Sequence, residues 1–180
     1  MDADSLVAAI QAAVPEAQVE RAPSVDLHTT IYVSRDQVPA LARALRAQLA
    51  FDFLSELTAA DYWPKEPRFE VVYVLVSIAN RQRVRIKVRL PGDDPHVQTV
   101  SDVWPAANWL EREVWDLFGI AFDGHPDPRR LLMPEDWQGF PLRKDHPVQI
   151  RMTPNASEAL QVTEEEFRSN LMKDRLTRGR

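Results

Sequence analysis

The 180-residue sequence contains no cysteine, and this excludes several functions before any motif is considered. Without a thiolate the chain cannot form a disulfide, ligate zinc through sulfur, hold an iron–sulfur cluster through cysteine or use a thiol nucleophile. Glycine is also scarce, with only 5 residues, and neither a glycine-rich phosphate loop nor a serine nucleophile elbow is present. Taken alone, these absences argue against redox chemistry carried by this chain.

Long apolar runs are missing as well. The longest, residues 71–79, has the length of a strand and falls far short of the roughly 18–20 residues that span a bilayer. The N-terminus is acidic, whereas a secretory leader starts with basic residues. We therefore expect a cytosolic protein that reaches a membrane only through a partner. A net charge of −5 gives no general electrostatic case for nucleic-acid binding.

Proline, by contrast, is abundant, with 14 residues, and the rest of the composition is that of a globular domain. Apolar and turn-forming residues divide the first 95 residues into a helix, two strands, a second helix and three more strands. This order predicts a two-layer α+β sandwich, with helices on one face of a mixed or antiparallel sheet. Phe51, Phe53 and Leu57 are expected in register on one strand. The expected helices are 4–14 and 36–49, the latter capped by Asp36, and the expected strands are 19–22, 27–33, 51–63, 71–79 and 81–90.

The last of these strands has the clearest pattern in the sequence. Basic residues at Arg81, Arg83, Arg85, Lys87 and Arg89 alternate with aliphatic residues, so period two places all the bases on one face. Three interpretations stay open for this face: a solvated surface, a docking surface for an acidic partner, or a nucleic-acid surface. Nucleic-acid binding is the least favoured, because no aromatic residue alternates with the bases to stack on nucleotides.

After residue 95 the sequence changes character. Ser101 or Asp102 is the expected cap of a helix over 104–118, with Gly119 ending it. The following segment, residues 119–150, is called the strap: from Pro126 onward its prolines exclude a regular helix or a central strand, yet it carries several large apolar side chains. The expected organisation is a sheet domain (1–95), a docking helix with the strap (96–150) and a charged, partly helical tail (151–180).

A divalent metal site can be drawn from Glu113, Asp116 and His125, which lie close in sequence. Arg112, Arg129 and Arg130 offer the same carboxylates cationic partners, and we favour ion pairing that folds the strap back onto its helix. We predict no metal, cofactor or catalytic residue in this chain.

The helix and strap instead suggest a docking element. Prolines lower the entropy cost of ordering a segment on a partner, and Trp and Arg are enriched at the centres of interfaces. The alternative is an irregular extension packed on its own domain. The candidate docking residues are Glu111, Arg112, Glu113, Asp116, His125, Arg129, Arg130, Trp137, Arg143, Lys144 and Asp145.

At these residues the sequence resembles a known family, the C-type subunit of bacterial NADH:quinone oxidoreductase, which is respiratory complex I. The mitochondrial counterpart of this family is iron–sulfur protein 3. The resemblance rests on residues at the family's spacing, and Pro128 and His146 depart from it mildly where Leu and Tyr are usual. The matching residues are Glu111-Arg112-Glu113, Asp116-Leu117-Phe118, His125, Arg129, Leu131-Leu132-Met133-Pro134-Glu135-Asp136-Trp137 and Pro141-Leu142-Arg143-Lys144-Asp145-His146-Pro147. We call residues 111–147 the signature segment.

The resemblance implies a cofactor-free member of the peripheral arm, on the cytoplasmic face of the bacterial inner membrane. Its strap would clasp the D-type subunit, which forms the quinone-reducing site with the B-type subunit. FMN and iron–sulfur clusters in other subunits would carry electrons from NADH to quinone, coupled to proton translocation. Two alternatives remain: the equivalent subunit of a membrane-bound hydrogenase or of a quinone reductase with another donor, and a free-standing binding module that uses the basic strand face.

Overall fold

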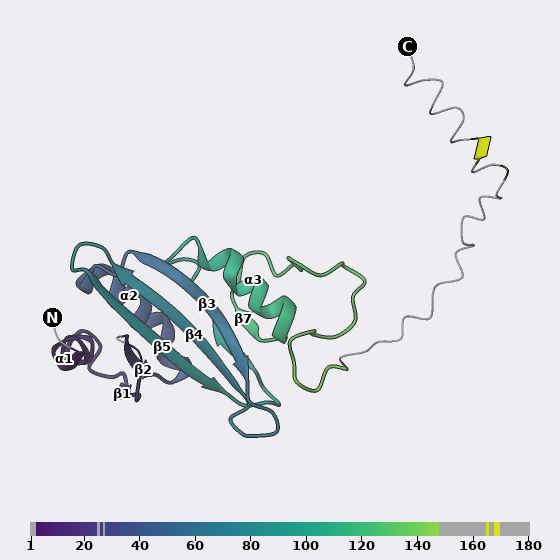
Figure 1. Cartoon of the computed structure of the whole chain (residues 1–180). Coiled ribbons are helices and arrows are strands. Elements are labelled where there is room, and N and C mark those ends of the chain that lie inside the picture. The colour runs from purple at the N-terminus through teal and green to yellow at the C-terminus, as the bar shows by residue number, and fades with distance from the viewer. Residues whose placement is uncertain (1–2, 25, 27, 148–164, 166–167, 170–180) are drawn as a thin grey trace, which may run out of the picture. The chain divides into compact units, whose positions relative to one another are not determined.

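The computed structural model describes residues 3–24, 26, 28–147, 165 and 168–169, and the chain divides into two compact units, Met1–His146 and Pro147–Arg180. The elements of the first unit, shown in Figure 1, are α1 (Ala3–Ala13), β1 (Glu20–Arg21), β2 (Thr29–Tyr32), the short helix η1 (Arg35–Gln37), α2 (Val38–Leu49), β3 (Phe53–Asp61), β4 (Phe69–Ser77), β5 (Gln82–Leu90), β6 (His96–Gln98), α3 (Ala107–Phe118) and β7 (Ala121–Asp123). The expected domain limit at residue 95 stays a prediction, and the expected tail helix lies almost entirely outside the described residues.

Five strands form one mixed sheet in the order β1-β2-β5-β4-β3. The β2 and β5 strands run parallel, and the other neighbours are antiparallel. Helix α2 lies behind the sheet as drawn in Figure 1, and α3 packs along the β3 side. The predicted α+β architecture is therefore confirmed. Among the described residues, no helix is both long enough and apolar enough to cross a bilayer.

The core lies between this sheet and the helices. On β5 the aliphatic residues Val84, Ile86, Val88 and Leu90 are all buried, as the alternating pattern predicted. They pack with buried residues of α1, α2, β3 and β4 in a single apolar cluster that also includes Val114 and Phe118 of α3. Helix α3 is thus joined to the sheet by the same core that holds α2.

The predicted register of β3 was wrong. Phe51 and Leu57 are buried, but Phe53, expected on the same face, is 52% exposed. Phe51 lies before the strand begins, and the pairing of β3 with β4 is irregular between Leu54 and Glu56. One extra residue in a strand moves the residues beyond it to the opposite face, which separates Leu57 from Phe53.

The predicted helix caps were also wrong. Asp36 lies in η1, and α2 begins at Val38 without a side-chain cap. Neither Ser101 nor Asp102 caps α3, because the N–H groups of Val103 and Trp104 bond to the carbonyl of Val100 and form a separate turn before the helix. The C-terminal end was predicted correctly: Gly119 ends α3 in the left-handed conformation, at φ 70°.

Candidate functional site

Asp116 organises the start of the strap. Its buried carboxylate accepts N–H bonds from Leu131, Leu132 and Met133 on Oδ2, at 3.0, 2.7 and 2.9 Å, and a bond from Arg130 Nη1 on Oδ1 at 2.6 Å. Burial opposes ionisation of Asp116, but these bonds outweigh it and lower its pKa. Three successive backbone donors thus converge on one carboxylate of α3.

Arg112 binds the two strap residues that precede this cluster. It lies one helical turn before Asp116, so both side chains project from the same side of α3. Its Nε and Nη2 donate to the carbonyl oxygens of Arg129 and Arg130, both at 3.0 Å. The predicted ion pairing that folds the strap back onto its helix is confirmed for Asp116 with Arg130, whereas Arg112 holds the strap through backbone carbonyls and Arg129 pairs with Asp127 instead.

Glu111 points to a different neighbour, because adjacent helical residues diverge by about 100°. Its fully buried carboxylate accepts bonds from the Val100 N–H at 2.8 Å and from Thr99 Oγ1 at 2.5 Å. His125 Nε2 lies 3.8 Å away and also contacts the carbonyl of Asn108 at 3.0 Å. Burial is the largest influence on Glu111 and raises its pKa to about 7, against the two hydrogen bonds.

The Glu111→Gln variant is expected to remove a pH dependence of stability. From pH 4.5 to 7 the unfolded chain ionises Glu111 while the folded chain keeps it protonated, so the free energy of unfolding falls as pH rises. The difference between wild type and Glu111→Gln should change by about 3 kcal/mol between pH 4 and 8, measured by urea unfolding. Glu113→Gln, two residues further along the same helix, is the control and should follow the wild-type curve; equal curves for all three proteins would contradict the prediction.

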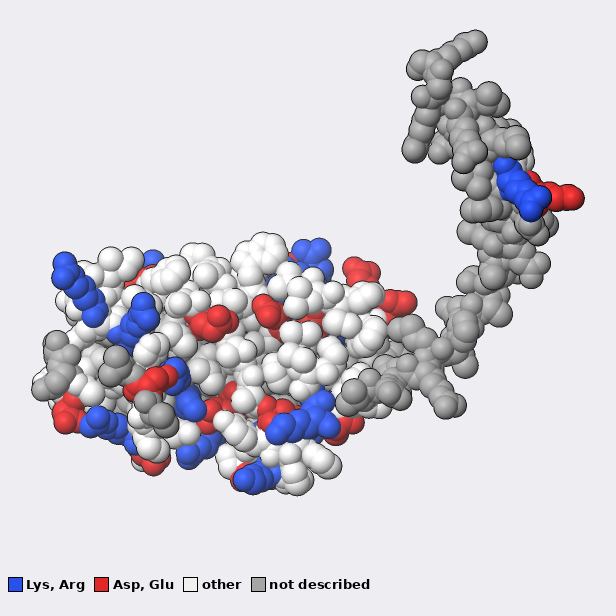
Figure 2. All heavy atoms as spheres, viewed as in Figure 1, with Lys and Arg blue, Asp and Glu red and all other residues white. Residues whose placement is uncertain are grey.

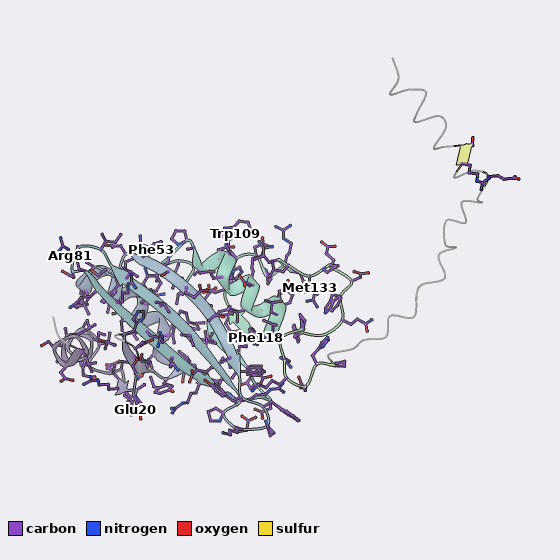
Figure 3. All side chains as sticks on the ribbon, in the orientation of Figure 1. Glu20, Phe53, Arg81, Trp109, Phe118 and Met133 are labelled. Carbon is purple, nitrogen blue, oxygen red and sulfur yellow. The ribbon has the colours of Figure 1, made fainter. Side chains whose placement is uncertain are left out.

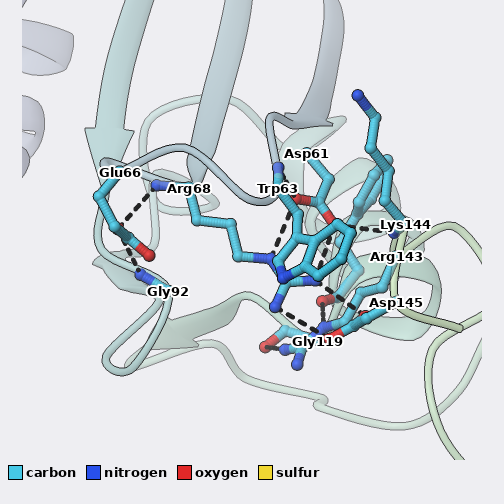
Figure 4. Close-up of polar contacts among 10 residues, drawn as sticks. Asp61, Trp63, Glu66, Arg68, Gly92, Gly119, Arg143, Lys144 and Asp145 are labelled. Atoms are coloured by element: carbon cyan, nitrogen blue, oxygen red, sulfur yellow. Dashed lines mark hydrogen bonds and ion pairs between the residues drawn. The ribbon is translucent and has the colours of Figure 1, made fainter.

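The end of the strap is anchored on the β3–β4 hairpin by a buried ion network (Figure 4). Arg68, which is 8% exposed, bonds Asp61 through Nε at 3.0 Å and Nη2 at 2.8 Å, and its Nη1 reaches Asp145 at 3.0 Å. The Lys144 N–H adds a bond of 2.9 Å to Asp61. Burial opposes ionisation of Asp61, but the bonds from Arg68, Lys144 and Trp63 lower its pKa to about 2.

Arg143 joins this anchor to the end of α3. Its Nε donates to the carbonyl of Phe118 at 2.5 Å and its Nη2 to that of Gly119 at 3.3 Å. A cation at the C-terminus of a helix is favourable because the last carbonyls are otherwise unpaired and carry partial negative charge. The guanidinium also lies over the rings of Phe140 and Phe69, 4.6 and 5.2 Å from their centroids.

The remaining candidate residues take less part in these contacts. Arg129 is exposed and pairs with Asp127, Trp137 is half-buried and its carbonyl accepts a bond of 2.8 Å from Arg130, and Glu113 is half-buried. Within the described residues no three His, Asp or Glu side chains come together as metal ligands. Sequence reasoning missed Asp61, Arg68 and Thr99, which come from other elements and carry no motif.

With the polar groups turned inward, several apolar side chains of this region face outward. Trp109 is 59% exposed, Leu132 59% and Leu142 51%. Figure 3 shows Trp109 at the outer surface of α3 and Met133 on the strap beyond it. The polar signature residues therefore shape the strap, and α3 and the strap expose three large apolar side chains among charged ones.

Known sequences of one protein family match most of this chain. The family model described as "Respiratory-chain NADH dehydrogenase, 30 Kd subunit" matches residues 31–151. The C-type subunit of the NADH-quinone oxidoreductase from Geobacter sulfurreducens is 51% identical over 121 residues, which are 67% of this chain and 75% of that protein. Its counterpart from Roseiflexus castenholzii is 44% identical over 151 residues, covering 82% and 86% of the two chains.

Solved structures share the fold. The trypsin-resistant fragment (1–134) of Nqo5 superposes with a TM-score of 0.57 at 33% identity, covering 71% of this chain and 99% of the fragment. A chain of the membrane-bound sulfane sulfur reductase, an archaeal respiratory membrane complex, gives a TM-score of 0.70 at 28% identity, covering 82% of this chain and 87% of that one.

Proposed function

This chain belongs to the family of the respiratory-chain NADH dehydrogenase 30 kDa subunit, and from that premise we propose that it is a non-catalytic, peripheral-arm member of a proton-translocating NADH:quinone oxidoreductase. Its partners are other subunits of that complex. Its α3 helix and strap clasp the D-type subunit beside the quinone-reducing site, which the D-type and B-type subunits form together. The chain carries no cofactor, and FMN and the iron–sulfur clusters reside in the neighbouring subunits. The complex holds this chain at the cytoplasmic face of the inner membrane.

The observation that carries this proposal is that α3 and the strap bury several charged groups and expose large apolar side chains. The buried charges of the signature segment bond to the chain's own backbone, as with Asp116 and the N–H groups of residues 131–133. Large apolar side chains on α3 and the strap, Trp109, Leu132 and Leu142, are more than half exposed. A strap that is ordered before it binds, with apolar side chains outward, loses little entropy when a partner covers it.

The docking surface is tested by Leu132→Glu combined with Leu142→Glu. Both side chains are exposed, so we expect the isolated chain to stay folded. Its recovery with the complex should fall at least about tenfold, because burying a charge in an apolar contact costs more than about 1.4 kcal/mol. Co-purification from solubilised membranes with a tagged chain measures the effect. Reversal of Arg130 is unsuitable, because it would leave the buried Asp116 without its cation.

A matched control places two glutamates on α2, at the exposed residues Ala40 and Ala47, and should leave recovery unchanged. If the Leu132/Leu142 variant is recovered with the complex as well as wild type is, the strap is not the docking element.

A second candidate function is the equivalent subunit of a reductase with a different electron donor. The observation that favours it is the match to a chain of the sulfane sulfur reductase, with a TM-score of 0.70 over 82% of this chain. Mass spectrometry of the same purification separates the two: NADH- and FMN-binding subunits support the first, and their replacement by another donor module supports the second.

A further inference from the structure

The face of the sheet opposite the core carries an apolar band that no described element covers. Along β4 the outward residues are Val72, Val74 and Val76, all partly exposed. Phe53 of β3 pairs in register with Val76 on the same face. Figure 2 shows mostly uncharged side chains over β3 and β4 on this side, interrupted by acidic ones, with Lys and Arg side chains towards β5. One acidic residue of this face is the exposed Glu56 of β3, which pairs in register with Val74. We call Phe53, Val72, Val74 and Val76 the valine band.

This composition is unusual for a sheet face in contact with water. Antiparallel strands with one solvated face normally alternate between apolar residues inward and polar residues outward. The β5 strand follows this rule, with Arg83, Arg85, Lys87 and Arg89 outward, and the β4 strand beside it does not. Adjacent apolar side chains on an open face indicate a surface that another molecule covers.

The cations that border the valine band are only half neutralised within the chain. Arg85 pairs with Asp26 at 2.7 Å, and Lys87 pairs with Glu70 at 2.8 Å. Among the described residues, no carboxylate lies within ion-pair distance of Arg83 or Arg89, although the Arg89 guanidinium stacks on Tyr32 at 3.6 Å. Six residues along a strand separate these two arginines by about 20 Å.

We propose that this face docks a second member of the same complex, through an apolar ridge that covers the valine band and carboxylates that pair with Arg83 and Arg89. The proposal rests on the proposed function, because it takes the partner from the same assembly, and it adds an interface separate from the strap. It also gives the basic strand face a docking role, one of the three interpretations that the sequence left open.

The charges on this face favour an acidic protein over other occupants. Nucleic acid is bound by phosphate contacts along a continuous row of cations, and two of the four cations here already have carboxylate partners. A second copy of this chain would offer the same basic face, so that cations would meet cations. A lipid surface is entered by projecting apolar side chains, whereas Val72, Val74 and Val76 are only partly exposed.

The proposal is tested by photo-crosslinking in the assembled complex. We place p-benzoylphenylalanine at position 74 in the valine band, at position 132 in the strap and at the exposed position 47 of α2 as the control. We expect position 74 to form an adduct with another subunit of the complex, mapped to a peptide that contains Asp or Glu, and position 47 to form none. No protein adduct at position 74, or an adduct with lipid, nucleic acid or a second copy of this chain, would overturn the inference.

Two substitutions supply a quantitative readout. Arg83→Glu with Arg89→Glu should lower recovery with the complex about tenfold, equivalent to about 1.4 kcal/mol, while the isolated chain keeps its thermal midpoint. Val74→Thr, which keeps a β-branched residue in the strand, should lower recovery less. Unchanged recovery for both variants contradicts the docking face. Failure of the proposed function looks different: wild-type chain would then be recovered without any quinone oxidoreductase subunit.

Discussion

Replacing Asp116 by alanine is expected to release the strap from α3 and to lower the free energy of unfolding by about 3–5 kcal/mol, because the change leaves a cation and three backbone donors without their acceptor. In the folded chain Arg130 is only partly exposed, and the N–H groups of residues 131–133 all point at this carboxylate. No other described carboxylate lies within ion-pair distance of Arg130.

Two measurements check this expectation. Urea unfolding gives the loss of stability, and amide exchange should show faster exchange at residues 131–133 than in wild type. Asp116→Asn keeps the shape of the side chain but replaces one acceptor oxygen by an NH₂ group, which faces other donors. We therefore expect a loss of stability between those of wild type and Asp116→Ala. Asp136→Ala, at an exposed strap position, is the control and should change stability by less than about 0.5 kcal/mol. Slow exchange at residues 131–133 in Asp116→Ala would show that the strap is ordered by other contacts.

Acidification should also lower the free energy of unfolding, by less than the Asp116→Ala change does. The pKa of Asp116 lies below its ordinary value of 3.8, so its bonds add stability at neutral pH that is lost as pH falls through that lowered value. Glu111 acts with the opposite sign, since its raised pKa makes the fold less stable as pH rises towards 7. Both carboxylates are buried on one helix, yet they respond to pH in opposite directions, because Asp116 receives four hydrogen bonds and Glu111 only two.

The parts of the fold that the sequence predicted are those with a local period. The alternation of basic with aliphatic residues is contained within the nine residues of β5, and the burial pattern of this strand matches it. Pairing of β3 was not predictable in the same way, because its irregularity between Leu54 and Glu56 interrupts the period without a glycine or proline to mark it. The predicted caps of α2 and α3 were wrong for a related reason. Turns formed by backbone hydrogen bonds precede both helices, where the sequence predicted polar side chains as caps.

In the candidate site, too, local sequence patterns predicted only some of the contacts. Spacing alone indicated that carboxylates on the helix would meet arginines of the strap, and Asp116 with Arg130 confirms it. The partners of Glu111 and Asp145 are Thr99, the Val100 N–H and Arg68, and they were not predicted. Arg68 lies 77 residues from Asp145 in the sequence, and nothing in either segment identifies the other. Contacts of this kind follow from the packing of the sheet against α3 rather than from a motif.

The prolines of the strap fit this arrangement. Pro128 and Pro134 bracket residues 129–133. In this segment the carbonyls of residues 129 and 130 accept bonds from Arg112, and the N–H groups of residues 131–133 donate to Asp116. Prolines restrict the unfolded chain and so reduce the entropy that the strap loses on ordering. The polar residues of the signature segment therefore act first on the strap itself, and any docking role that they have depends on the shape they impose.

Replacing Arg68 by methionine tests the other end of the strap, and we expect a loss of about 3–5 kcal/mol in the free energy of unfolding. The side chain of Asp61 is 1% exposed, so without Arg68 its charge would be buried with only backbone donors as partners. The Asp145 side chain is 44% exposed and should matter less, with a loss of about 0.5–1 kcal/mol in Asp145→Asn. Lys65→Met, at an exposed position of the same hairpin, is the control and should resemble wild type.

The pH dependence distinguishes an unpaired carboxylate from a general loss of packing. In wild type the pKa of Asp61 is about 2, so its contribution is present at neutral pH and is lost only in strong acid. In Arg68→Met the desolvated Asp61 binds a proton more readily, so the stability difference from wild type should shrink as pH falls from about 6 to about 3. A difference that stays constant over this range would mean that the loss comes from the contact of Arg68 with the Phe69 ring, 4.8 Å from its centroid, rather than from the ion pair. A shrinking difference would identify the buried ion pair as the link that fixes the end of the strap to the sheet.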